Sequence, residues 1–86
     1  MNEYRYCVNT FSNGKPVQIS GYVEAESEDY AILKLIDDGT VYRRGYEFLE
    51  LALVFENPTA YEKLVIARMR EEGMSDEEIE RFLREI

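Results

Sequence analysis

The segment Tyr4–Ser27, with the sequence YRYCVNTFSNGKPVQISGYVEAES, decides the fold of this chain. Asn13-Gly14 near its middle offers the positive φ angles that a two-residue hairpin turn requires. On both sides of this turn, residues alternate with the period of two that is expected when one face of a sheet is buried. The residues predicted to face inward are Tyr4, Tyr6, Val8, Val17, Ile19, Val23 and Ala25. Gly21 interrupts this row, which indicates a bulge or a close approach of another group to the backbone.

A helix is predicted directly after the hairpin. Ser27 is suited to be its N-cap, and Glu28 and Asp29 follow in the first turn, where the helix dipole favours negative charge. Gly39 is expected to end the helix. The side chains expected to pack on the hairpin are Ile32, Leu35 and Ile36.

Residues 46–56 fit two kinds of element. Their apolar side chains alternate as in a strand, whereas the abundance of Glu, Leu and Ala favours a helix. The alternating residues are Leu49, Leu51, Leu53 and Phe55. We predict a strand, because a lone hairpin is marginally stable in water and a third strand beside a helix buries one face of the sheet.

Two more helices are predicted after this strand. Pro58 suits the first position of the earlier helix, which Gly73 ends, and its expected apolar face is Tyr61, Leu64, Val65 and Met69. Ser75 and Glu78 form the S-x-x-E capping box of the last helix. The apolar residues of that helix are Ile79, Phe82, Leu83 and Ile86.

The expected fold class is therefore α+β, with a three-stranded antiparallel sheet in the order strand-strand-helix-strand followed by two C-terminal helices. A chain of 86 residues is long enough for one hydrophobic core. We expect a single domain over residues 1–86, made of a ββαβ core at residues 1–56 and a helical hairpin at residues 57–86.

Residues 22–55, YVEAESEDYAILKLIDDGTVYRRGYEFLELALVF, resemble the DpnD/PcfM-like proteins, small polypeptides carried by phages, plasmids and other mobile elements. The likeness lies in VEAES at the end of a strand, the acidic helix entry, the DDG stop and the hydrophobic strand that follows. The chain departs from the family pattern at Tyr30, in the inserted RRGY and in its two additional helices. The resemblance implies the same core and a mobile-element setting, and it brings no catalytic residue.

The composition argues against catalysis. The chain has no His, and therefore lacks the commonest general base and the commonest zinc ligand. Cys7 is the only cysteine, so no internal disulfide is possible, and its place in a strand pattern favours an inert thiol. Paired carboxylates such as Asp37 and Asp38 lack the spacing of a calcium loop and are expected to face water. We expect no enzymatic activity, no metal and no cofactor.

The charge of the chain bears on its partners. Eighteen acidic and ten basic residues give a net charge of −8, which repels phosphate and attracts basic surfaces, although the same charge also serves solubility. Arg43 and Arg44 are too few to overcome this charge, and Asp76, Glu77 and Glu78 would repel DNA if the last helix were a recognition helix. We expect no direct binding of nucleic acid. The absence of a leader pattern and of a long apolar segment predicts a cytoplasmic location.

Small size and dispersed acidity resemble those of the small anti-CRISPR inhibitors. The sequence therefore predicts a phage or mobile-element inhibitor that occupies a basic surface on a host protein, such as a CRISPR effector or another nuclease, and blocks it by acidic mimicry of nucleic acid. The predicted partner-binding residues are Glu24, Glu26, Glu28, Asp29, Asp37, Asp38, Asp76, Glu77, Glu78 and Glu80. The alternative is an accessory or structural homodimer with an apolar interface, in which an edge strand at Tyr4–Phe11 or the third strand pairs with its twin.

Overall fold

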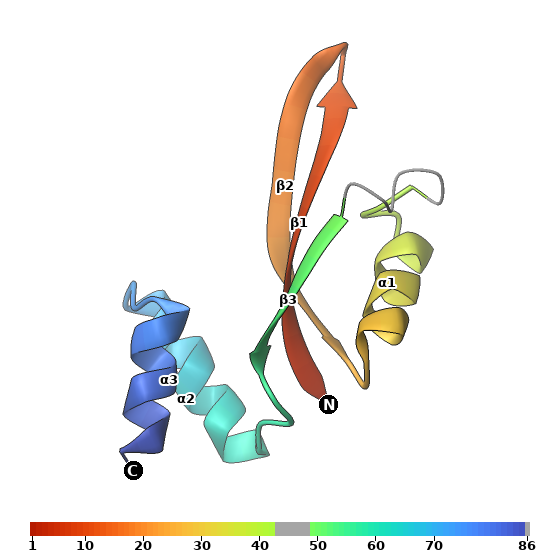
Figure 1. Ribbon diagram of the computed structural model, residues 1–86. Coiled ribbons are helices and arrows are strands. Elements are labelled where there is room, and N and C mark those ends of the chain that lie inside the picture. The colour runs from red at the N-terminus through yellow and green to blue at the C-terminus, as the bar shows by residue number, and fades with distance from the viewer. Residues whose placement is uncertain (43–48, 86) are drawn as a thin grey trace. The chain divides into compact units, whose positions relative to one another are not determined.

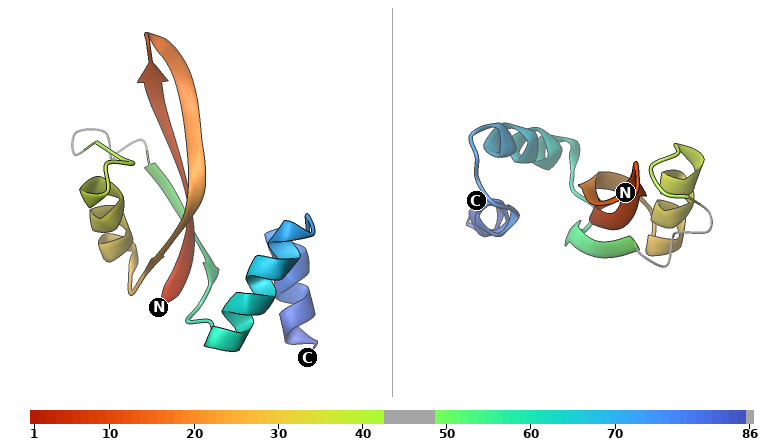
Figure 2. Two further views of the ribbon diagram at one scale, coloured as in Figure 1. Left: turned by 180° about the vertical axis from the view of Figure 1, so that it is seen from behind. Right: turned by 90° about the horizontal axis from the view of Figure 1, so that it is seen from above.

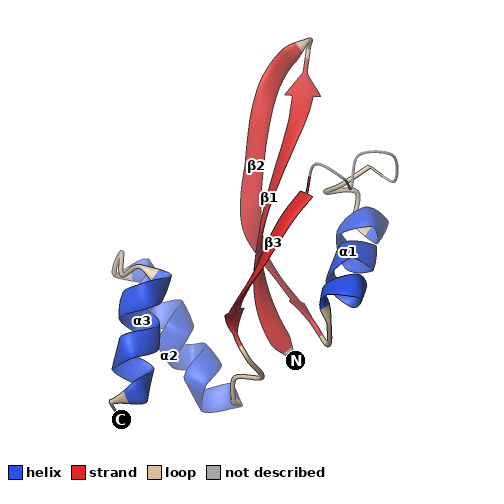
Figure 3. Cartoon of the chain, viewed as in Figure 1, coloured by secondary structure: helices blue, strands red, loops and turns tan. Residues whose placement is uncertain are grey.

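The computed structural model describes residues 1–42 and 49–85 (Figure 1). Its elements are β1 (Asn2–Ser12), β2 (Lys15–Ala25), α1 (Glu28–Asp37), β3 (Leu49–Phe55), α2 (Ala60–Glu71) and α3 (Asp76–Arg84). Figure 3 distinguishes the strands of the sheet from the helices by colour. The α+β class and the three-stranded antiparallel sheet are therefore as predicted. The inserted RRGY, the first part of the predicted strand and Ile86 lie outside the described residues.

The chain divides into two compact units, Met1–Glu56 and Asn57–Ile86, which we call the N-terminal and the C-terminal unit. The N-terminal unit contains the sheet and α1, and the C-terminal unit contains α2 and α3.

The sheet has the strand order β2-β1-β3, and β1 pairs antiparallel with both neighbours. The segment Tyr4–Phe11 thus belongs to the central strand, and its expected position at an edge was wrong. The reason is that the chain returns from α1 to the far side of β1, so that β2 and β3 form the edges. An isologous pairing through β1, one form of the homodimer alternative, is thereby removed.

The turn between β1 and β2 sets their pairing. Asn13 and Gly14 have φ angles of 54° and 77°, the positive values that a type I′ hairpin turn requires, as predicted. Ser12 consequently stands opposite Lys15, and the same register runs without a shift to Asn2 opposite Ala25.

The predicted third strand is confirmed at Leu49–Phe55, but its alternation is interrupted. Leu53 pairs with Tyr4, whereas Phe55 pairs with Glu3, so that one extra residue, Val54, lies between them. Such a bulge moves Phe55 out of the row formed by the leucines. Phe55 is nonetheless buried.

The core of the N-terminal unit lies between the sheet and α1. One cluster joins Tyr4, Ala25 and Ala31, and a second joins Val8, Leu35 and Val41. The other residues expected to contribute, Tyr6, Val23, Ile32 and Ile36, are partly buried.

The inward prediction fails in the first half of β2, where Val17 and Ile19 are 38% and 40% exposed. The physical reason is length, because eleven extended residues reach about 36 Å whereas the ten residues of α1 cover only about 15 Å. Figures 1 and 2 show the free end of the β1–β2 hairpin extending beyond α1. The core-facing side of α1 therefore leaves Val17 and Ile19 exposed.

Gly21 marks a close approach, one of the two possibilities that the sequence left open. It stands opposite Tyr6, and a Cβ atom at Gly21 would lie 2.7 Å from the Tyr6 hydroxyl oxygen and 2.9 Å from the ring carbon that carries it. The tyrosine ring therefore occupies the space above the glycine, an arrangement in which a cross-strand aromatic ring covers a glycine.

We expect Gly21→Val to displace the Tyr6 ring and to lower the free energy of unfolding by about 1–2 kcal/mol. In a Tyr6→Ala background the same change should be neutral or stabilising, because valine suits a strand better than glycine. Urea unfolding of the four proteins in this double-mutant cycle measures the coupling. Equal effects in both backgrounds would show that the ring does not restrict this position.

In the C-terminal unit, Thr59 caps α2. The Glu62 backbone N–H donates to the Thr59 hydroxyl at 3.1 Å, and the Thr59 N–H donates to a Glu62 carboxylate oxygen at 2.9 Å. This reciprocal capping box fixes the helix start after Thr59, so Pro58 precedes the cap and is not the first helical residue as predicted. Gly73, with φ of 85°, follows the helix end as expected.

The buried side of α2 differs from the predicted one. Ile66 is buried and Val65 and Met69 are partly buried, whereas Tyr61 and Leu64 are 67% and 72% exposed. The sequence missed Ile66 because two overlapping apolar stripes exist on this helix and only one of them is covered. On α3, Ile79 is buried and Leu83 partly buried as predicted, whereas Phe82 is 43% exposed.

An ion pair connects the two helices of the C-terminal unit. The Arg70 Nε and Nη2 atoms both donate to one Asp76 carboxylate oxygen, at 3.2 and 3.1 Å. The two side chains are only 23% and 16% exposed, in contrast to the Arg68–Glu72 pair, which is 82% and 60% exposed. Because it is partly buried, the Arg70–Asp76 pair is expected to contribute more to stability than the exposed Arg68–Glu72 pair.

Arg70→Ala should therefore lower the free energy of unfolding of the C-terminal unit by about 1–2 kcal/mol, because Asp76 loses a charged partner. The matched control Arg68→Ala should change it by less than about 0.5 kcal/mol. Hydrogen exchange of the α2 and α3 amides measures both effects. Equal protection of the α2 and α3 amides in the two variants would contradict the larger contribution of the Arg70–Asp76 pair.

Candidate partner-binding face

Six of the predicted partner-binding residues lie in the N-terminal unit, around α1 and the end of β2. Glu24 and Glu26 flank Ala25 at the end of β2. Glu28 and Asp29 form the first turn of α1, and Asp37 and Asp38 are its last residue and its C-cap. Ser27 fixes the start of this helix, since its hydroxyl accepts the Tyr30 N–H at 3.4 Å, which confirms the predicted N-cap.

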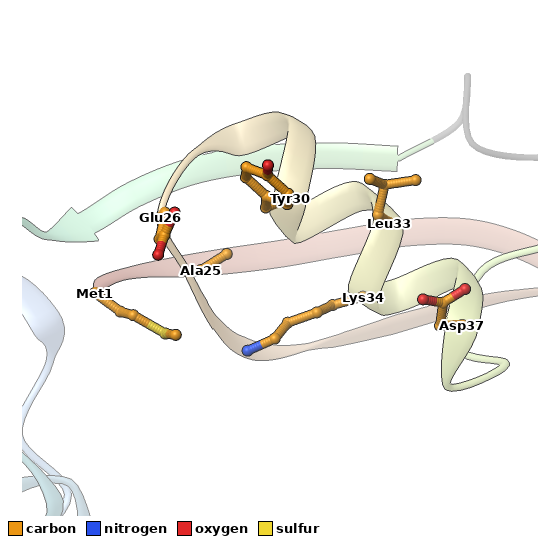
Figure 4. Close-up of a pocket in the computed structure, with 7 residues that line it drawn as sticks. All are labelled: Met1, Ala25, Glu26, Tyr30, Leu33, Lys34 and Asp37. Atoms are coloured by element: carbon orange, nitrogen blue, oxygen red, sulfur yellow. The ribbon is translucent and has the colours of Figure 1, made fainter.

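A depression of about 520 Å³ lies between α1 and the end of β2 (Figure 4). Its lining residues are Met1, Ala25, Glu26, Tyr30, Leu33, Lys34 and Asp37. In Figure 4, Asp37 lies at one end of α1 and Glu26 at the other, while Lys34 extends from the helix toward Met1. The Lys34 ammonium donates to the Glu24 backbone carbonyl at 2.6 Å, which ties α1 to β2.

A second depression adjoins the first and shares Lys34 and Asp37 with it. Its lining residues are Tyr22, Val23, Glu24, Lys34, Asp37 and Asp38. The two depressions together define one surface, which we call the α1–β2 face. The structure thus brings four of the predicted acids, Glu24, Glu26, Asp37 and Asp38, to a common surface, with Glu28 and Asp29 on the same helix.

The charge of the α1–β2 face is negative, because its four carboxylates outnumber the ammonium groups of Lys34 and Met1. The Thr40 hydroxyl and then the Thr40 backbone N–H hydrogen-bond the Asp38 carboxylate, and they hold the pKa of Asp38 below its usual value. Hydrogen bonds to the charged form favour ionisation, so this carboxylate remains charged at and below neutral pH.

Apolar side chains lie among these acids, and the sequence analysis did not assign them to the site. Tyr30 and Leu33 are 58% and 53% exposed, and Met1 and Tyr22 are also exposed. The signal was present in the spacing, because Tyr30 and Leu33 are three residues apart and lie beside the Ala31–Leu35 side that faces the core. Exposed Tyr and Met side chains inside a charged rim are typical of protein interfaces.

The four remaining predicted residues lie on α3 in the C-terminal unit, and three of them have partners there. Asp76 pairs with Arg70, the Glu78 carboxylate accepts the Ser75 hydroxyl at 3.0 Å, and Glu80 pairs with Arg84. Glu77 is exposed. Capping and ion pairing account for the positions of these three acids in α3 without any external ligand.

The described residues of the two units show no metal-binding geometry. Among residues 1–42 and 49–85, no group of three or more His, Cys, Asp or Glu side chains is placed to hold a metal ion. Cys7 is a free, partly buried cysteine near Arg5 and Glu50, on the side of the sheet opposite the core. In the part of the chain that the structure describes, no helix has the length and hydrophobicity needed to cross a membrane.

The α1–β2 face thus combines carboxylates with exposed apolar side chains. Such a surface suits a partner that offers basic groups around an apolar contact. Comparison of the chain with protein-family models, with curated proteins and with solved structures finds no match.

Proposed function

We propose that this protein is a non-enzymatic binding protein that occupies a basic surface on another protein through the α1–β2 face. The observation that carries the proposal is the gathering of Glu24, Glu26, Asp37 and Asp38 around two adjoining depressions, the first of which is also lined by exposed Tyr30 and Leu33. Carboxylates alone would serve solubility. The apolar side chains among them favour a contact surface, because burying them gives a partner binding energy.

The mechanism has two stages. The net charge of −8 draws a basic surface toward the chain and raises the rate of encounter. Tyr30 and Leu33 then bury apolar area, while the surrounding carboxylates accept hydrogen bonds from Lys and Arg side chains of the partner. These carboxylates stand where the phosphates of a nucleic acid would bind, so that the bound protein excludes the nucleic acid from its channel.

The nature of the partner follows from charge and from the sequence resemblance. A surface of this sign repels nucleic acid itself, so a nucleic-acid-binding protein fits better than DNA or RNA. The resemblance of residues 22–55 to the DpnD/PcfM-like proteins, and of the whole chain to small acidic anti-CRISPR inhibitors, favours a host defence nuclease such as a CRISPR effector. A phage or mobile-element inhibitor acting in the cytoplasm of its host is the corresponding role.

Charge reversal tests the acidic part of the face. Glu26→Lys with Asp37→Lys should weaken binding of the captured partner at least tenfold, because two carboxylates at the contact become repulsive. The matched control is Glu71→Lys with Glu85→Lys, two exposed acids of the C-terminal unit whose reversal changes the net charge equally. Partners are captured from nuclease-treated bacterial lysate on the tagged protein, identified by mass spectrometry and titrated with both variants.

The control variant distinguishes a direct contact at the α1–β2 face from the general attraction of a basic partner to an acidic chain. We expect the control pair to weaken binding less than threefold at 150 mM salt, where distant charges are screened. Equal losses in the two variants would place the contact elsewhere, and a partner that binds both variants like the parent chain would refute the proposed face. Competition by added DNA or guide RNA should displace the partner if its nucleic-acid channel is blocked.

Tyrosine replacement tests the apolar part. Tyr30→Ala should weaken partner binding at least tenfold, because an exposed aromatic side chain beside a depression is a typical anchor. Tyr61→Ala, which removes an equally exposed tyrosine from α2, should leave the affinity unchanged. Isothermal titration calorimetry of both variants measures the difference, and far-UV circular dichroism verifies their fold. An unchanged affinity for Tyr30→Ala would mean that the acids act without an apolar anchor.

A further inference from the structure

The β1–β2 hairpin differs in charge from the rest of the chain. Residues 6–23 contain a single charged side chain, Lys15, so this segment carries +1. Because the whole chain carries −8, the remaining residues carry −9. Two copies of this protein therefore repel each other over most of their surface and do so least at the hairpin.

The outer edge of β2 is open in the described sheet, since β2 pairs only with β1. Ser12 and Lys15 close the two-residue turn, so the odd-numbered residues of β2 direct their backbone groups to β1 and the even-numbered ones direct them outward. The hydrogen bond from Lys34 to the Glu24 carbonyl is consistent with this direction. Pro16, which has no N–H, takes an outward position, as proline does on edge strands.

The open edge is bordered by apolar side chains on one face. Val17 and Ile19 lie on the same side of the sheet as the core, and both are about two-fifths exposed. Gln18 and Ser20, between and beside them, are exposed and direct their backbone N–H and C=O groups outward. This stretch thus combines unpaired strand geometry, exposed branched side chains and no charge, the combination that favours strand addition.

We propose that β2 pairs antiparallel with β2 of a second copy across a two-fold axis at Ile19. In that register Gln18 of each copy stands opposite Ser20 of the other, and their outward backbone groups form two equal hydrogen-bonded pairs. Ile19 meets its own copy at the axis. Val17 faces Gly21, which has no side chain and is covered by the Tyr6 ring of its own copy.

A second copy suits this edge better than an unrelated strand for two reasons. The pattern around Ile19 is self-complementary, because a branched side chain at Val17 meets a glycine at Gly21 under the same two-fold axis. The edge of β3 is less suited to pairing with a second copy, because β3 is shorter than β2, contains Glu50 and is interrupted by the bulge at Val54. The inference does not depend on the α1–β2 face, and either can fail alone.

The salt dependence of binding gives the first test, because added salt should strengthen self-association through β2 and weaken partner binding through the α1–β2 face. Self-association through an uncharged edge of an acidic chain should strengthen at least threefold between 50 and 500 mM NaCl, because salt screens the repulsion between copies. Partner binding through the α1–β2 face should weaken over the same range. Sedimentation equilibrium of the full chain measures the dimer directly. A monomer at all protein and salt concentrations up to 1 mM chain would overturn the proposal.

Two variants test the position of the interface. Ser20→Pro removes an outward N–H without removing a bond between β1 and β2, and it should weaken the dimer at least tenfold with an unchanged circular dichroism spectrum. Ile19→Lys places two like charges at the axis and should do the same. The matched control Phe11→Lys, at an exposed apolar residue on the opposite face of the hairpin, should not. A dimer that persists in both test variants would refute this edge.

Cross-linking tests the register. In a Cys7→Ser background, Ile19→Cys should give a disulfide-linked dimer on mild oxidation, because non-hydrogen-bonded antiparallel pairs bring Cα atoms to about 4.5 Å. Phe11→Cys in the same background should give at least tenfold less. Equal cross-linking at both positions would indicate random collision and would contradict the two-fold axis at Ile19.

Discussion

The Asn13-Gly14 turn is the constraint on which the rest of the N-terminal unit depends. Its two positive φ angles place Ser12 opposite Lys15, and that single pair determines every later pair in the hairpin. The register sets Tyr6 over Gly21 and brings Tyr4 beside the end of β2, where Ala25 and Ala31 leave room for its ring. A shift by one residue would turn the aromatic side chains away from α1 and leave the helix without a core.

The mismatch in length between the hairpin and α1 then divides β2 into two regions with different properties. The end near α1 is tied to the helix by Lys34 and carries the acids of the α1–β2 face. The end near the turn extends past the helix and carries Val17 and Ile19 in contact with solvent. One strand therefore supplies a charged surface and an uncharged edge, because a ten-residue helix cannot cover the length of an eleven-residue strand.

The order of elements and most of their ends were predictable from local chemistry. The hairpin turn, the Ser27 cap and the stops at Gly39 and Gly73 depend on residues close in the chain, and the structure has each of them. The errors concern contacts between distant residues. Local pattern could not show that β3 would pair with β1, that a bulge would reorient Phe55, or that α2 would bury Ile66 and expose Tyr61. The acids of the candidate site were identifiable by composition, whereas Tyr30 and Leu33 became part of it only when the core side of α1 was known.

The two proposed surfaces have a geometric consequence when they are considered together. Six residues separate Ile19 from Ala25, so a two-fold axis at Ile19 would place the two α1–β2 faces about 40 Å apart along the joined strands. Both faces would carry the same acids and the same exposed tyrosine. Because Ile19 lies near the middle of β2, the same register would set Lys15 of each copy opposite Val23 of the other, beside Glu24 of the α1–β2 face. Such a dimer presents two binding faces related by a two-fold axis, and it would bind most tightly to a partner whose basic sites have the same symmetry and a similar spacing, since the second contact is then intramolecular. The oligomeric state of the partner would thus determine how much dimerisation through the uncharged edge of β2 raises the affinity of binding.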